Sequence, residues 1–157
     1  DLSDLVNSGS RRGIRTSGTV VAIANNSGII ERCPECRRVM RDGECAEHGP
    51  QRGEEDVRLR FVLDDGISNA STLIGKEATE ALTGMDQGQI RDAIDANTRA
   101  GFIATLRERF LARKLHINGR AMVDAQGAIL MADSVDVDTR TPEEAANEVM
   151  TRWGVVL

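Results

Sequence analysis

The chain has 157 residues, of which 40% are hydrophobic and 3% aromatic, and its formal net charge is −5. This length indicates one domain with short appendages and a core of aliphatic side chains. The acidic balance argues against indiscriminate nucleic-acid binding but allows a local basic face. No stretch resembles a transmembrane helix or a signal peptide, so we expect a cytoplasmic protein that has no membrane partner.

The N-terminal part predicts a linker followed by a strand. Residues 1–13 are polar and contain Ser-Gly-Ser and Arg-Arg-Gly, which is typical of a linker. The first residue is not Met, so we expect a segment of a longer protein. Residues 14–24 are rich in β-branched side chains and predict the first strand, and residues 25–28 form a turn signal.

Every cysteine of the chain lies in the stretch that follows. Cys33 and Cys36 have two residues between them, as do Cys45 and His48, and eight residues separate the two pairs. These are the four donors that a tetrahedral Zn²⁺ needs, and they leave no open position, so the metal is expected to be structural. The alternative of disulfide-bonded cysteines is disfavoured because three cysteines cannot pair off. We therefore predict one Zn²⁺ in a zinc ribbon over residues 29–50.

The clearest strand covers residues 57–63, where apolar and basic side chains alternate. Arg58 and Arg60 share its outward face and are candidate ligands of phosphate groups. Three further arginines at the edge of the zinc ribbon can extend this basic path: Arg37, Arg38 and Arg41. The alternative is that these side chains form an ordinary solvated surface. The carboxylates of Asp64 and Asp65 precede a glycine and indicate a hairpin turn rather than catalysis.

The remaining elements alternate between strand and helix patterns. A third strand is expected over residues 67–74, and helices over 76–83, 86–97 and 102–114, whose apolar stripes face the core. A final hairpin follows, with strands over residues 115–123 and 128–137. Five strands with helices between the third and fourth predict a mainly β, five-stranded OB barrel over residues 14–138, with the zinc ribbon between strands one and two.

Residues 139–157 predict a last helix. Thr141, Pro142 and Glu144 supply a strong start signal. The helix has one apolar stripe, which we interpret as an oligomerisation surface: Ala146, Val149, Met150 and Trp153. The alternative is a helix that folds back over the end of the barrel.

The motifs over residues 28–36, 43–49 and 63–66 resemble those of archaeal replication protein A, the euryarchaeal single-stranded DNA-binding proteins with a zinc-bearing OB domain. Arg11-Arg12-Gly13 and Gly119-Arg120 also fit that family. The layout is similar to the C-terminal DNA-binding domain of the eukaryotic replication protein A large subunit. There, a zinc ribbon lies between the first two barrel strands, and a helix after the barrel joins the subunits.

The resemblance implies a non-catalytic, nucleoid-associated domain that protects single-stranded DNA in replication, repair and recombination. It implies no small-molecule substrate, and contacts to other replication protein A subunits through the C-terminal helix. Its zinc ligands correspond to the four residues identified above. Because the outward face of the second strand offers no aromatic platform for stacking bases, an alternative stays open. In that alternative the domain mainly assembles the complex, and other OB domains bind the DNA.

Replacement of Trp153 by Ala tests the expected role of the last helix. If the stripe is an oligomerisation surface, light scattering will show dissociation of the assembly, because a large apolar anchor is lost. The thermal midpoint of the monomer will stay nearly unchanged. A less stable monomer with an unchanged assembly would instead place the helix in the core of the barrel.

Overall fold

The computed structural model describes residues 11–124, 127–139 and 147. Residues 1–10 of the expected linker lie outside this part of the chain. The apolar stripe of the predicted last helix, from Ala146 to Trp153, does so as well. Its role in oligomerisation stays a prediction.

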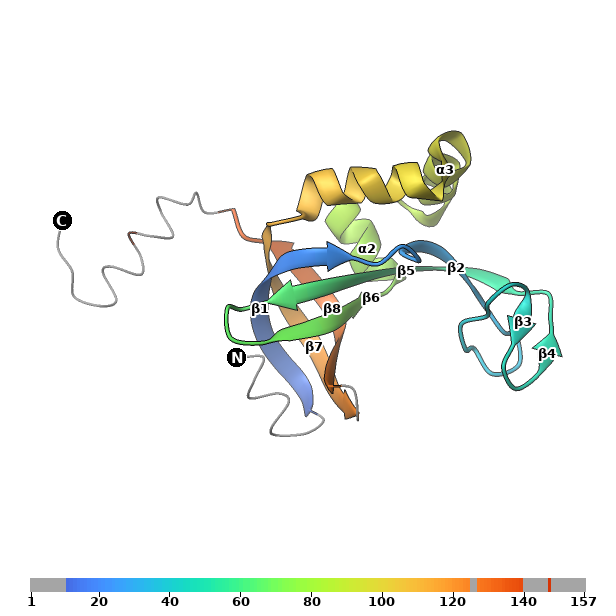
Figure 1. Ribbon diagram of the computed structural model, residues 1–157, viewed down its shortest axis with the longest axis horizontal. Helices are drawn as coiled ribbons and strands as arrows, with labels where there is room; N and C mark the ends of the chain where they lie inside the picture. The colour runs from blue at the N-terminus through green and yellow to red at the C-terminus, as the bar shows by residue number, and fades with distance from the viewer. Residues whose placement is uncertain (1–10, 125–126, 140–146, 148–157) are drawn as a thin grey trace.

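Five long strands form a closed ring (Figure 1). Around the ring, β1 pairs with β7, β7 with β8, β8 with β6, β6 with β5, and β5 again with β1. Only the β6–β8 pair is parallel. This mainly β arrangement resembles the OB fold. The bounds are β1 (Arg11–Ile23), β5 (Glu54–Asp64), β6 (Asn69–Ile74), β7 (Lys114–Asp124) and β8 (Gly127–Val137).

Two boundaries differ from the prediction at the N-terminal side. β1 begins at Arg11, so residues 11–13 belong to the sheet and not to a linker. The polar residues of this extension do not have a strand pattern, so it was not predicted. It forms because β7 is long enough for Ala121 to pair with Arg11, across an irregularity in register. β5 likewise begins at Glu54, three residues before the predicted strand.

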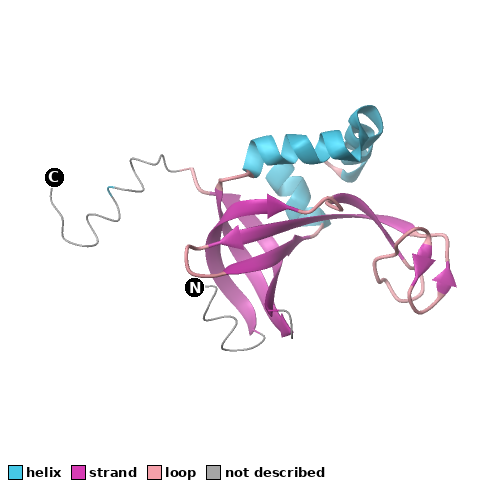
Figure 2. Ribbon diagram, viewed as in Figure 1, coloured by secondary structure: helices cyan, strands magenta, loops and turns pink. Residues whose placement is uncertain are grey.

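The early start of β5 is explained by a short strand that was not predicted. β2 (Gly28–Arg32) pairs with the first half of β5, outside the ring. A small hairpin of β3 (Glu44–Cys45) and β4 (Gly49–Pro50) then projects beyond it. Figure 2 shows that this hairpin and its loops stand away from the ring and the helices.

Helices fill the connection between β6 and β7, as predicted. α2 (Lys76–Thr83) has the predicted bounds. α3 (Gln87–Phe110) joins the second and third predicted helices across a break at Thr98, whose φ and ψ are 65° and 165°. It starts at the predicted cap, where the Asp86 carboxylate accepts a hydrogen bond from the Gln89 amide at 2.8 Å. It ends at Phe110, earlier than the predicted end at Lys114. The backbone of Ala112 and Arg113 instead forms hydrogen bonds with Val20 of β1.

The core lies between the ring and α3. The predicted apolar face of β5 is fully buried, and the Phe61 ring lies 5.9 Å from the Phe110 ring, centroid to centroid. α3 adds Ile90, Phe102 and Leu106 to the same cluster. Within the described ranges, no helix combines the length and apolar character needed to cross a membrane.

Replacement of Gly119 by Ala tests the packing of the β7–β8 hairpin. A Cβ atom at this position would lie 2.1 Å from the backbone oxygen of Met131, beside the register shift between Asn118 and Gly119. Because backbone must move to relieve this clash, we expect a loss of about 2–3 kcal/mol in the free energy of unfolding.

Urea denaturation measures the effect, with Gly75→Ala as the control. A Cβ at Gly75 meets no atom within 4 Å, and its φ of −76° suits any residue. Equal stability of the two variants would show that the hairpin does not pack as described.

Candidate metal centre and arginine groove

The four predicted metal ligands come together in space. The ligand atoms of Cys33, Cys36, Cys45 and His48 all lie within 4.8 Å of one another. The His48 Nδ1 is 3.6 Å from the Sγ atoms of Cys33 and Cys45, and the Cys36 and Cys45 Sγ atoms are 3.6 Å apart. Zn–S and Zn–N bonds of about 2.3 and 2.0 Å give tetrahedral edges of about 3.5–3.8 Å. The donor set therefore fits a zinc ion.

Two turns bring these ligands together. Around the first cysteine pair, the Arg37 amide bonds the Cys33 carbonyl at 2.8 Å, and the Cys33 amide bonds the Arg38 carbonyl at 2.9 Å. The second turn has Asp42 and Gly43 at its centre, with φ angles of 53° and 76°. This left-handed pair is the turn that the Asp-Gly sequence predicts. It leads into β3 and β4, which hold Cys45 near His48.

The surroundings of the cluster also suit a metal ion. The Glu35 carboxylate lies 3.3 Å from His48 Nε2, which leaves Nδ1 directed at the sulfur atoms. Metal-bound histidines commonly have such a carboxylate partner. The pKa of the Cys45 thiol is lowered to about 6, chiefly by hydrogen bonds from the backbone amides of Glu47 and His48. The thiolate is the form of cysteine that binds zinc.

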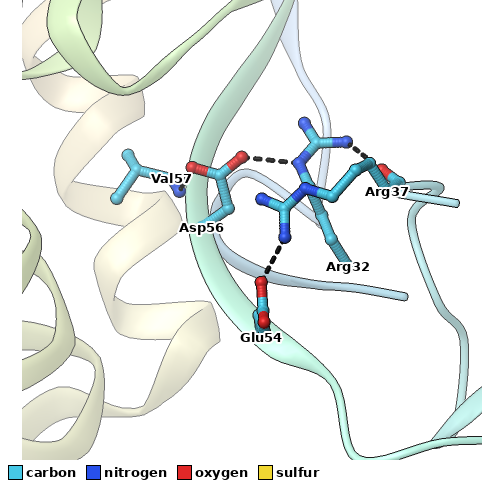
Figure 3. Close-up of polar contacts among 5 residues, drawn as sticks. All are labelled: Arg32, Arg37, Glu54, Asp56 and Val57. Carbon is cyan, nitrogen blue, oxygen red and sulfur yellow. Dashed lines mark hydrogen bonds and ion pairs between the residues drawn. The ribbon is translucent and has the colours of Figure 1, made fainter. Parts of the chain in front are cut away.

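Ion pairs tie this Cys₃His module, residues 33–50, to β5. Arg32 Nε lies 2.5 Å from the Asp56 carboxylate, and an Arg32 N–H is donated to the Arg37 carbonyl at 3.0 Å. Figure 3 shows both contacts. The Arg37 side chain in turn pairs with Glu54. Arg38 is 2.9 Å from Glu47. Two of the predicted DNA-binding arginines, Arg37 and Arg38, are thus engaged with carboxylates.

The other three predicted arginines line one groove of about 720 Å³. Arg58 and Arg60 reach it from β5, and Arg41 from the Cys₃His module. Arg91 and Arg99 of α3 complete the set of five arginines, against three carboxylates: Glu31, Asp42 and Glu55. The sequence analysis missed the two helical arginines, because nothing in the spacing of α3 indicates which of its many charges meets the sheet.

Arg58 is the most unusual residue of the groove. Its Nε is buried and has no hydrogen-bond partner. The pKa of its guanidinium is lowered first by burial, then by the positive charges of Arg32, Arg60 and Arg41. A partly buried cation surrounded by other cations gains most from a bound anion. Arg60 is exposed beside it and donates to the Ser71 hydroxyl at 3.4 Å.

The groove contains no aromatic side chain. All three phenylalanines lie in the core, so the described part of the chain exposes no aromatic ring. Any ligand held here depends on charge and hydrogen bonding rather than on stacking.

Comparison with known proteins finds similarity in structure but none in sequence. No protein-family model matches the sequence, and no curated protein matches it. A chain of a replication protein A heterotrimer bound to single-stranded DNA superposes with a TM-score of 0.62 at 17% identity, over 96% of this chain. The present chain spans 37% of the length of that protein. Yeast replication protein A bound to single-stranded DNA gives a TM-score of 0.57 at 11% identity, over 92% of this chain and 86% of the other. These likenesses concern the fold.

Replacement of Cys36 by Ala tests the metal centre. With one of four ligands removed, we expect the purified protein to lose its zinc and the Cys₃His module to unfold, while the ring strands persist. Metal analysis and the circular dichroism spectrum measure the two effects.

The matched control is Ala46→Ser. Ala46 is exposed and lies between Cys45 and His48, but it is not one of the four ligands. Wild-type protein that is purified without chelators and holds no zinc would contradict the assignment.

Proposed function

We propose that this chain is a zinc-containing OB domain of a replication protein A of the archaeal type, and that it binds single-stranded DNA without catalysis. The observation that carries the proposal is the arginine groove beside β5. In OB folds the second and third strands, with the loop between the first and second, bind oligonucleotides. Here β5 is the second strand of the ring, and the Cys₃His module lies in that loop.

The groove supplies the chemistry of backbone recognition. Arg58, Arg60 and Arg41 present guanidinium groups, which bind phosphate oxygens with charge-assisted hydrogen bonds. These contacts read no base, so binding is expected to be independent of sequence and strongly dependent on salt. Because no aromatic side chain is exposed nearby, stacking contributes little, and this domain alone is expected to bind more weakly than domains with aromatic platforms.

The zinc ion would have a structural role. Cys33, Cys36, Cys45 and His48 would hold it, and a closed coordination sphere supplies folding energy rather than reactivity. Arg41 directly precedes the Asp42–Gly43 turn and bonds Glu44 through its backbone at 3.0 and 3.1 Å. A folded module therefore holds this arginine at the groove.

An assembly role is the second candidate function. It is favoured by the lack of exposed aromatic rings in the described part of the chain and by the pairing of Arg37 and Arg38 with carboxylates. In this alternative, the predicted last helix binds other subunits. The DNA is then held by neighbouring OB domains. Both roles are compatible within one complex.

The combined variant Arg58→Ala/Arg60→Ala tests DNA binding. Fluorescence anisotropy with labelled oligothymidine and with a mixed-sequence strand should show weaker binding, by a similar factor for both. If each arginine meets one phosphate, the slope of log K against log salt falls by about 1.4, because each single-strand contact contributes about 0.7.

The control is Arg15→Ala/Arg120→Ala, which removes the same charge from exposed strand positions outside the groove. Equal affinity and slope for the two double variants would exclude the groove as the DNA site. No binding by the wild type, with intact assembly, would favour the second candidate function.

A further inference from the structure

α3 forms a second wall of the arginine groove. β2 is the last strand in the sheet order. Its outer edge pairs with no further strand and is bridged only near its end, between Arg32 and Val39. α3 contacts β2, and the two lie close together in Figure 1. Arg99 fixes the helix to this edge, because its guanidinium donates to the carbonyl of Ile29 at 2.6 Å and to that of Ser27 at 3.3 Å. The groove therefore continues from the strands to the helix.

Arg91 lies on the same wall but is held differently. Its guanidinium pairs with the Glu55 carboxylate, and Asp95 is 4.0 Å away. The side chains of Arg91 and Glu55 keep 41% and 36% of their surface exposed. Exposed pairs of this kind contribute little free energy, so they exchange partners readily. Arg99, bonded to backbone carbonyls, cannot exchange in this way without freeing the edge of β2.

Glu55 pairs with Arg91 but faces a like charge across the sheet. In the β2–β5 register it stands directly opposite Glu31. Like charges in directly opposed positions of an antiparallel pair destabilise the sheet. Both carboxylates line the groove, as does Arg91. Glu55 is therefore the anion that Arg91 pairs with in the groove.

We propose that the phosphate path continues round the outer edge of β2 to α3, and that a DNA phosphate displaces Glu55 from Arg91. This inference rests on the proposed function and adds to it. It extends the interface beyond the strand face to a helix outside the ring. In this proposal Glu55 competes with the DNA for Arg91, and so it weakens DNA binding.

The test is a double-mutant cycle of Arg91→Ala and Glu55→Gln in the full chain. Oligothymidine binding is measured by fluorescence anisotropy across a salt series. Arg91→Ala should weaken binding about three- to tenfold and lower the salt slope by about 0.7, the share of one phosphate contact. Glu55→Gln should strengthen binding about two- to fivefold, because the competing ion pair is gone. In the Arg91→Ala background, Glu55→Gln should have no effect.

Two variants serve as charge-matched controls. Arg113→Ala removes an exposed arginine just after α3, and Glu108→Gln an exposed carboxylate on α3, and neither residue lines the groove. Both should bind as the wild type does.

Three outcomes overturn the inference. If Arg91→Ala binds like Arg113→Ala while Arg58→Ala/Arg60→Ala binds weakly, the path ends at β5 and only this inference fails. If Glu55→Gln strengthens binding equally with and without Arg91, the carboxylate acts through its general charge and no exchange occurs. If the wild type shows no salt-dependent binding, the proposed function fails as well.

Discussion

One strand that changes its partner governs the arrangement of this protein. The second half of β5 belongs to the ring, where Phe61 pairs with Ile23 of β1. Its first half leaves the ring and pairs with β2, so that Arg58 lies opposite Gly28. Between the two, the buried Ser27 hydroxyl accepts a hydrogen bond from the Arg60 amide at 2.9 Å. This bond satisfies the Arg60 amide at the point where β5 pairs with neither β1 nor β2. Arg58 and Arg60, on either side of the change of partner, line the groove.

The Cys₃His module depends on this strand and on its metal ligands. Its own apolar cluster consists of Cys33, Met40 and Cys45, which is far too small to fold a chain segment alone. The ion pairs of Arg32 and Arg37 with β5 orient the module, but the Arg37–Glu54 pair is exposed and adds little stability. A bound zinc ion would supply the folding free energy that this small cluster cannot. The same pairs neutralise arginines that would otherwise extend the basic surface, which concentrates the positive charge in the groove.

Much of the fold follows from local sequence signals. The alternation over residues 57–63 and the cap at Asp86 identified β5 and the start of α3, and ligand spacing identified the cluster around Cys33. β2 was missed because its short apolar run has no alternation and gains its partner only through β5. The predicted boundary between the second and third helices corresponds to the break inside α3 at Thr98, where a β-branched residue has a positive φ. Arg91 and Arg99 could not be assigned to the groove, because their position depends on how α3 packs across β2.

The central claim is that the arginine groove holds the phosphate backbone of single-stranded DNA. The most direct measurement is a ¹⁵N–¹H spectrum of the arginine Nε–H groups, recorded while oligothymidine is added to the zinc-loaded protein. Arg58 has a buried Nε without a partner, so its signal should shift most, followed by those of Arg60 and Arg41. The signals of Arg15 and Arg113, outside the groove, should stay in place. Shifts confined to those outside arginines, with Arg58 unchanged, would contradict the account.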